Sequence, residues 1–187
     1  MSGDGRDIDL VRRLAGGDKA ALEELYTAYG QRLFAFALRL TNDPEAAEDV
    51  VQDALMAAWW SAKSYRGEGR LIAWLLGIIH HAAMKSLRHP SQPISEEMEQ
   101  ELAEPGPTPE ESIQNKEQSR WIESGLNSLT PEHREVIELV FYQKLSLQEI
   151  AQVCDCPIGT IKSRLSYARR HLRGILARQG MDTEETR

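Results

Sequence analysis

The spacing of the large apolar residues constrains the fold of this chain more than any other feature. Between positions 22 and 40 such residues recur every three or four positions, as on one face of an α-helix. They are Leu22, Leu25, Tyr29, Leu33, Phe36 and Leu40. No segment alternates apolar and polar residues over the length of a strand, and no Asn-Gly or Asp-Gly pair joins two such segments. The pattern predicts an all-α fold.

Start and stop signals divide the first half of the chain into helices. Asp18 can cap the helix that contains the apolar stripe, and Asn42-Asp43-Pro44 breaks the chain and restarts it. Asp43 is a good N-cap and proline suits the first helical position, which predicts a helix to about Lys63. A short loop over 64–69 then leads to an apolar segment over 71–89. This segment is apolar on more than one side, so we expect a largely buried helix.

The last third of the chain predicts a helix-turn-helix. Thr130 and Pro131 open a helix whose apolar stripe comprises Val136, Ile137, Val140 and Phe141. Ser146 and Glu149 have the spacing of a capping box, and the residues 154–156 make a tight turn before Pro157 restarts a helix. Two helices joined by a turn of this length are typical of DNA-binding domains.

The final helix, expected over 157–173, has an acid-free basic face. Segment 156–173 contains five Lys or Arg residues and no Asp or Glu. Its apolar face, expected to pack inward, comprises Ile158, Ile161, Leu165, Ala168 and Leu172. Small polar groups flanked by cations suit a helix in the major groove. The alternative is a solvated face, but no acids are present for pairing. The candidate DNA contacts are Thr160, Lys162, Ser163, Arg164, Tyr167, Arg169, Arg170 and Arg173.

The negative charge of the chain is concentrated in one segment. The formal net charge is −7, and residues 90–125 hold nine acidic side chains against two basic ones. This segment is also rich in Pro and Glu, which predicts a flexible, self-repelling linker. We therefore expect two small helical domains, over 1–89 and 126–187, joined by an acidic linker over 90–125.

Several kinds of site are not predicted. The two cysteines, Cys154 and Cys156, suit a protein in a reduced compartment. We expect them to be small core residues, and the alternative is a redox switch. His80 and His81 point about 100° apart on a helix, so the pair does not predict a metal site. There is no phosphate-binding loop or nucleophile motif, so we expect no catalytic residue, metal or cofactor.

No apolar run is long enough to span a membrane and the N-terminus does not look like a signal peptide, which predicts a cytoplasmic protein.

Two segments of the chain resemble one protein family. The segment SLQEIAQVCDCPIGTIKSRLSYARRHLR resembles region 4 of bacterial sigma factors, the domain that recognises promoters. AEDVVQDALMAAWW resembles the part of region 2 that binds the RNA polymerase clamp, and RGEGRLIAWLLGIIHHAAMKSLR resembles the promoter-melting segment after it. With two units and a linker, the chain resembles an extracytoplasmic-function (ECF) sigma factor of the sigma-70 family over roughly residues 9–176.

The resemblance assigns roles to residues of the first domain. Polymerase binding would involve Asp49, Gln52, Asp53 and Met56, which share one helix face; the alternative is plain solvated surface. Recognition and melting of the −10 element would involve Tyr65, Arg66, Gly67, Trp74, His81, Lys85 and Arg88. In the family, the loop that corresponds to 66–69 takes up a flipped base. The family usually carries an Asn and an Asp where this chain has His81 and Lys85, which puts its −10 sequence in doubt.

The resemblance implies a sigma factor without catalytic activity of its own. The first domain would be the region 2 helical bundle and the second the region 4 helix-turn-helix, which would read the −35 element. The expected partners are core RNA polymerase, through its clamp and flap, promoter DNA and an anti-sigma factor that could hold the monomeric protein at the membrane. The rivals are a sigma-like decoy that binds an anti-sigma factor, a conventional repressor or activator, for which no heptad seam appears, and an enzyme.

Overall fold

The first group of helices lies in the N-terminal half of the chain. The computed structural model describes residues 5–88, 125, 126 and 128–178, and every regular element in these ranges is helical. The first group comprises α1 (Gly5–Ala15), α2 (Lys19–Thr41), α3 (Pro44–Ser61), a 3₁₀ turn (Ala62–Ser64) and α4 (Leu71–Arg88). Helices α2, α3 and α4 pack against one another, and α1 packs against α2.

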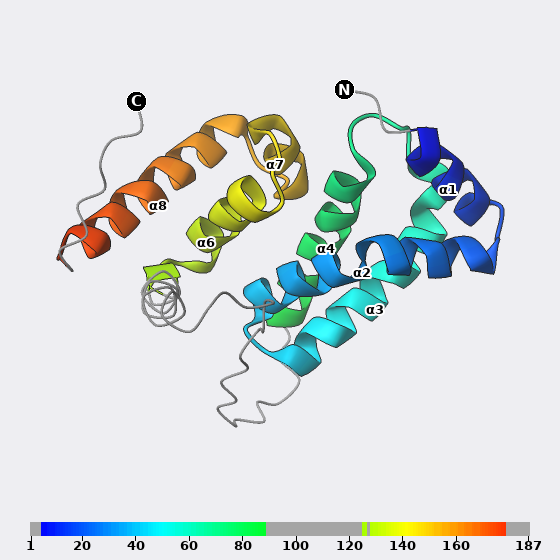
Figure 1. Ribbon diagram of the computed structural model, residues 1–187, viewed down its shortest axis with the longest axis horizontal. Coiled ribbons are helices and arrows are strands. Elements are labelled where there is room, and N and C mark those ends of the chain that lie inside the picture. The colour runs from blue at the N-terminus through cyan, green and yellow to red at the C-terminus, as the bar shows by residue number, and fades with distance from the viewer. Residues whose placement is uncertain (1–4, 89–124, 127, 179–187) are drawn as a thin grey trace, which may run out of the picture.

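The second group follows the undescribed segment. It comprises α6 (Pro131–Ile137), a π-helical turn η2 (Glu138–Tyr142), α7 (Leu147–Val153) and α8 (Ile158–Arg178). Figure 1 shows α6 between α8 and the first group of helices. The all-α prediction is confirmed, while the acidic segment 90–125 lies outside the described residues except for Gly125.

The predicted helix starts form as the local sequence dictates. The side chain of Asp18 accepts a hydrogen bond from the Ala20 N–H, and that of Asp43 accepts from Glu45 and Ala46. Asn42 closes α2 with φ of 56°, a left-handed conformation that Asn tolerates.

The start signals of the second group form in part. The capping box of Ser146 and Glu149 has both of its hydrogen bonds. Thr130 occupies the N-cap position of α6, but its hydroxyl lies 2.7 Å from His133 Nδ1 and caps no backbone N–H.

Helix α1 was not predicted, because its apolar residues are too few to define a period. Leu10, Val11 and Leu14 are nevertheless buried. The Tyr29 hydroxyl of α2 also donates a hydrogen bond of 2.6 Å to Asp7 of α1. Burial, followed by this hydrogen bond, raises the pKa of Tyr29 well above its usual value, so tertiary contacts rather than periodicity hold α1 in place.

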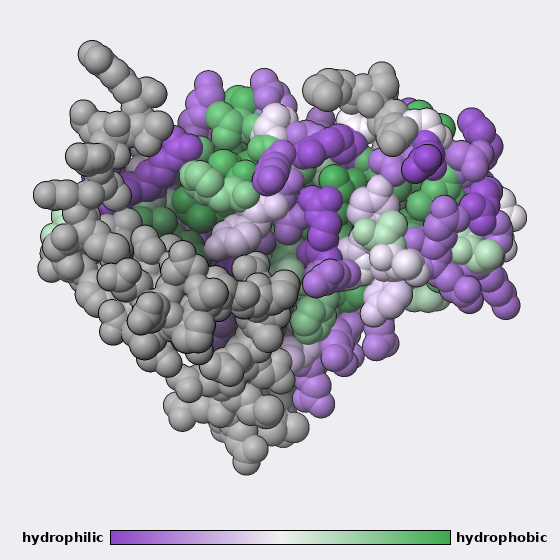
Figure 2. Space-filling model, in the orientation of Figure 1, coloured by the Kyte–Doolittle hydropathy of each residue, from purple (hydrophilic) through white to green (hydrophobic). Residues whose placement is uncertain are grey.

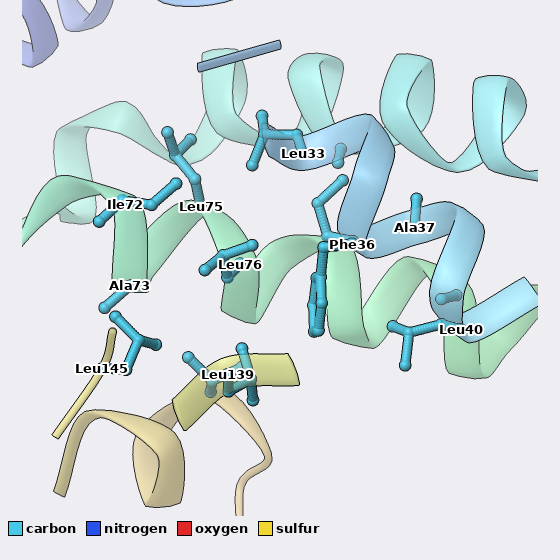
Figure 3. Close-up of a cluster of buried hydrophobic side chains, with 14 of the residues drawn as sticks. Leu33, Phe36, Ala37, Leu40, Ile72, Ala73, Leu75, Leu76, Leu139 and Leu145 are labelled. Carbon is cyan, nitrogen blue, oxygen red and sulfur yellow. The ribbon is translucent and has the colours of Figure 1, made fainter. Parts of the chain in front are cut away.

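The hydrophobic core is continuous across both groups of helices. Phe36 and Leu33 of α2 and Leu76 of α4 are almost completely buried. From the second group, Leu139 lies below Leu76 in Figure 3 and Leu145 lies next to Ala73. A Cβ atom on Gly77 would lie 3.8 Å from the Val153 backbone, an ordinary van der Waals distance, so α4 and α7 are in direct contact there. The two groups are therefore packed against each other.

Two apolar residues expected in the core are exposed. Phe141 is 52% exposed, because the π-helical turn η2 adds a residue to the helical repeat and rotates it outward. The same turn accompanies the burial of Glu138. Ile158, at the first position of α8, is 36% exposed, while Ile161, Leu165 and Ala168 are buried as predicted. Of the three tryptophans in α3 and α4, Trp59 and Trp74 pack against the core and Trp60 is exposed.

Candidate nucleic-acid interface

The basic face of α8 is open to solvent. Arg164 and Thr160 are half-buried, and the other six predicted DNA contacts are exposed: Lys162, Ser163, Tyr167, Arg169, Arg170 and Arg173. In the predicted turn before the helix, Asp155 has a left-handed conformation, with φ of 46°. Helix α8 thus presents a continuous cationic strip beside the turn.

Within the described residues, no cation of α8 forms an ion pair with a carboxylate. Two of them nevertheless have neighbours on the second group of helices. The pKa of Glu132 is lowered by its own backbone N–H, by the Thr130 hydroxyl and then by the charge of Arg164. The Arg169 guanidinium lies 5.7 Å from the ring centre of Phe141. The other three cations among the predicted DNA contacts, Lys162, Arg170 and Arg173, are exposed and the most available to a polyanion.

Tyr167 is held by aromatic neighbours. Its ring lies 4.3 Å from that of His133 on α6 and 6.0 Å from that of His171, measured between centroids. His171 Nε2 also lies 3.0 Å from the Ser128 hydroxyl. These contacts restrict the Tyr167 ring while leaving 44% of the residue exposed, so it can contact a ligand without a large loss of rotamer entropy.

The loop predicted to bind a −10 base is closed around two aromatic rings. The rings of Tyr65 and Trp74 lie 5.2 Å apart at 49°, and the Tyr65 hydroxyl donates to the Gly69 carbonyl at 3.4 Å. Gly67 and Gly69 have positive φ values, which glycine adopts without strain. Arg66 is exposed beside them. The loop has a defined shape, with one exposed cation at its rim.

The other predicted −10 residues lie farther along α4. His81 and Lys85 are exposed, and their spacing from Trp74 places all three on one side of the helix. The backbone of Arg88 continues the helix, and its side chain lies outside the described residues. The sequence-predicted set therefore forms a strip on α4 that begins at the loop.

The predicted polymerase-binding residues share an exposed strip of α3. Asp49, Gln52, Asp53 and Met56 are all exposed. Gln52 also lines an open groove of about 1000 Å³ between α2 and α3. Tyr26, 56% exposed, lines the same groove. The sequence did not identify Tyr26 as a site residue, because it lies outside both the apolar stripe of its helix and the segment that resembles the family. Figure 2 shows largely hydrophilic surface over this group of helices, with smaller hydrophobic areas within it.

Among the described residues, four pairs of polar side chains join the two groups of helices, and the sequence predicted none of them. Arg39 lies 3.0 Å from Glu138, Arg70 lies 2.8 Å from Glu149, and Arg32 donates to Gln143 at 3.0 Å. In the fourth contact, His80 Nδ1 lies 2.5 Å from Glu135 Oε1. All four join residues that are far apart in the sequence, so no local pattern signals them.

Burial raises the pKa of two ionisable groups at this contact. Burial raises the pKa of Glu138, although Arg39 and then Gln143 oppose the shift. Burial also raises the pKa of the Cys154 thiol well above its usual value, and the nearby Glu135 adds to the rise. A thiol that stays protonated is a poor nucleophile, which favours the interpretation of Cys154 as a core residue. Within the described residues, His80, Glu135 and Cys154 form the one group whose side chains could hold a metal ion.

Comparisons with known proteins identify the family of both groups of helices. The family model described as sigma-70 region 2 matches residues 25–91, and the model described as sigma-70, region 4 matches residues 125–174. The first match includes the strips on α3 and α4, and the second includes the basic face of α8. None of the helices in the described residues is long and apolar enough to cross a membrane.

Two relatives match this chain along most of their own length. The ECF RNA polymerase sigma factor SigK of Mycobacterium tuberculosis is 31% identical over 176 residues, covering 91% of this chain and 94% of that protein. The ECF RNA polymerase sigma-E factor of Haemophilus influenzae is 30% identical over 174 residues, covering 87% and 91%. The sigma factor RpoE of Bartonella quintana, solved in complex with the anti-sigma factor NepR, superposes with a TM-score of 0.64 and 30% identity, covering 83% and 96%.

Proposed function

This chain belongs to the ECF RNA polymerase sigma factors of the sigma-70 family, and we propose how its residues divide the work of promoter-specific initiation. As a transcription initiation factor it is not an enzyme: it binds core RNA polymerase and promoter DNA. We assign region 2 to residues 1–89, a linker to 90–125 and region 4 to 126–187. The observation that carries the assignment of DNA binding is the acid-free exposed face of α8.

Region 4 reads the −35 element through α8. Lys162, Arg170 and Arg173 are exposed and without a carboxylate partner in the described residues, as contacts to phosphate require. Thr160 and Ser163, near the start of the helix, are small enough for close approach to base edges. The Ser163 hydroxyl donates to the Thr160 carbonyl at 2.9 Å, so its lone pairs remain to accept from a base.

Region 2 opens the −10 element along α4. The loop with Arg66 and Gly67 receives an extruded base beside Tyr65 and Trp74, whose tilted rings supply the apolar contact that offsets unstacking. Along the same side of the helix His81 offers a hydrogen bond, and Lys85 with Arg88 holds phosphate. This arrangement predicts a −10 preference different from that of members with Asn and Asp at those two positions.

Polymerase binding involves the strip of Asp49, Gln52, Asp53 and Met56 on α3. Exposed carboxylates beside an apolar side chain match a partner surface with cations around an apolar centre. Gln52 and Tyr26 extend this strip into the groove between α2 and α3.

An anti-sigma factor controls the protein by covering these surfaces in the cytoplasm. The Bartonella quintana sigma factor was solved with such a partner, which supports the same kind of control here. Any attachment to a membrane would come from the anti-sigma factor. The present chain acts as a monomer.

Run-off transcription tests the function directly. Purified core polymerase is assayed with and without the full chain on a library of genomic promoters. We expect discrete new start sites that share upstream elements, and these sites supply the promoter sequence. Binding to core polymerase with no new transcript would contradict the assignment of −10 opening to α4. Absence of both binding and transcript would favour a sigma-like decoy that only captures an anti-sigma factor.

A further inference from the structure

A buried cluster joins the two groups of helices at a single point. His80 comes from α4, Glu135 from α6 and Cys154 from the end of α7. One ligand atom from each lies within 4.8 Å of the other two. The side chains of His80 and Glu135 are 12% and 3% exposed, and Cys154 is 8% exposed. An imidazole nitrogen, a carboxylate oxygen and a sulfur atom therefore meet away from bulk water.

The charge of Glu135 distinguishes this cluster from the neighbouring polar contacts. Glu138 has Arg39 at 3.0 Å, and Glu149 has Arg70 at 2.8 Å. Glu135 pairs with His80, and no Lys or Arg within the described ranges lies within ion-pair distance of it. A buried carboxylate needs a cation or a proton to offset the loss of hydration. A metal ion at this position would supply that charge.

We propose that His80, Glu135 and Cys154 form a binding site for a late first-row divalent cation, Zn²⁺ in the first place, that clamps the two groups of helices together. Nitrogen, carboxylate and thiolate ligands are those of zinc, whereas Mg²⁺ and Ca²⁺ take oxygen ligands only. The fourth position of a tetrahedral site is filled by water, since the cluster provides three protein ligands.

The observed geometry needs only small changes to hold the ion. Metal–ligand bonds of about 2.0–2.3 Å place the ligand atoms of a tetrahedral site about 3.3–3.8 Å apart. The present separations extend from 2.5 Å, between His80 and Glu135, to no more than 4.8 Å. Side-chain rotations that move the ligand atoms by about 1 Å would bring these separations into the range of a tetrahedral site. The incoming cation replaces the thiol proton of Cys154, which leaves to solvent, because a coordinating thiol is deprotonated by the metal.

The site can form only while the two groups of helices are in contact. One ligand belongs to region 2 and two belong to region 4, so separation of the groups removes the metal's ligands. An ion that binds one arrangement alone stabilises it by mass action. Zinc therefore favours the packed arrangement.

The consequence for transcription rests on the proposed function. Elements centred near −10 and −35 are about 25 base pairs, or about 85 Å, apart on B-DNA. In the packed arrangement α4 contacts α7, which contacts α8, so α4 and α8 lie within about 20 Å of each other. The two helices therefore cannot contact the −10 and −35 elements at the same time until the two groups of helices separate. The bound metal is thus an inhibitor of promoter engagement.

Metal binding is tested on the metal-free full-length chain alone. Zn²⁺ is titrated in competition with a chromophoric chelator, and Co²⁺ is used as a spectroscopic probe of thiolate ligation. We expect one ion per chain and a thiolate-to-cobalt absorption band. His80→Ala, Glu135→Gln and Cys154→Ala should each weaken zinc binding by at least about 10-fold. Glu135→Gln keeps the size of the side chain, and its thermal unfolding without metal checks that the fold persists.

Two matched controls separate the site from adventitious binding. Cys156→Ala removes the neighbouring cysteine, and His81→Ala removes the exposed histidine next to His80. Both should retain the zinc affinity of the unaltered chain within about 2-fold. The proposal is overturned if the chain binds no zinc stoichiometrically, or if the control substitutions weaken binding as much as those in the cluster.

The clamp is tested by amide hydrogen exchange and by promoter binding. Zinc should slow exchange in α6 and α7 of the unaltered chain and of Cys156→Ala, but not of Glu135→Gln. At free zinc 100 times its Kd, the affinity of the chain with core polymerase for promoter DNA that carries both elements should weaken by up to about 100-fold, again only where the cluster is intact. Stoichiometric zinc binding without slower exchange would overturn the clamp. Slower exchange in a chain that directs no transcription even without zinc would instead count against the proposed function.

Discussion

On α8, Lys162, Arg170 and Arg173 extend into solvent with no acidic partner among the described residues, whereas Arg39 of α2 lies 3.0 Å from the buried carboxylate of Glu138. The two regions carry similar side chains in opposite settings. A cation without a carboxylate keeps its charge for an external polyanion, while a cation beside a buried carboxylate offsets the loss of hydration within the protein. The difference separates surfaces that bind partners from contacts that hold the two groups of helices together.

Breaking a buried pair should give the largest effect. Arg39→Met leaves Glu138 uncompensated and also removes the guanidinium that lies 4.8 Å from the ring centre of Tyr142. We expect the free energy of unfolding to fall by about 3 kcal/mol, measured by urea denaturation. The control Arg12→Ala removes a cation from an exposed pair and should change stability by less than about 0.5 kcal/mol.

A double substitution sharpens the same comparison. Arg39→Met combined with Glu138→Leu removes both charges, so most of the lost stability should return. If the double variant is no more stable than Arg39→Met alone, the cost does not come from the unpaired carboxylate.

Removing a cation from α8 should affect DNA binding and not stability. Arg170→Ala is expected to weaken binding to −35 DNA by about 10-fold and to lower the slope of log K against log salt by about 1 if the side chain contacts phosphate. Fluorescence anisotropy at several salt concentrations measures both quantities. Arg12→Ala serves as the charge-matched control, and an equal loss in that variant would show that only the net charge matters.

Arg164→Ala tests the half-buried member of the same set. It should also weaken −35 binding, by about 1–3 kcal/mol if it contacts a base. The neighbouring charge of Glu132 competes for this side chain, so its contribution to binding should be smaller than that of a free cation in the same position. Binding unchanged in both Arg164→Ala and Arg170→Ala would contradict the assignment of α8 to DNA.

On the exposed acidic strip, Asp49→Ala should weaken the binding of core polymerase by about 1 kcal/mol, because a single rim charge contributes little at a large interface. Binding of isolated −35 DNA should not change. Surface plasmon resonance with immobilised core polymerase and the anisotropy assay together separate the two surfaces. A parallel loss of DNA binding would indicate that Asp49 acts through the fold.

The smallest effect concerns the pH dependence of stability. Burial raises the pKa of Glu138 above the ordinary value of 4.5, so the folded state holds this proton more tightly than the unfolded state. Its contribution to stability is therefore present below about pH 4.5 and is lost as pH rises through the raised value. The stability of the unaltered chain relative to Glu138→Gln should fall over that window, measured by urea denaturation at a series of pH values. A difference that does not vary with pH would contradict the raised pKa.

The local features of the fold were predictable from the sequence. The N-caps Asp18 and Asp43 and the capping box of Ser146 with Glu149 act over a few residues, and each formed as predicted. The buried face of α8 followed from its period, apart from Ile158 at the helix start. Phe141 was misplaced because a π-helical turn breaks the 3.6-residue period on which the prediction rested.

By itself the sequence determined the helices that follow α1, their order and the basic character of α8, because periodicity, capping and charge act between residues a few positions apart. Only the tertiary structure decided that Glu135 meets His80, and that Cys154 lies beside them. These residues are separated by more than one helix, so their meeting depends on how α4, α6 and α7 pack. Packing of distant segments follows from burial of the whole apolar surface, which no local pattern records.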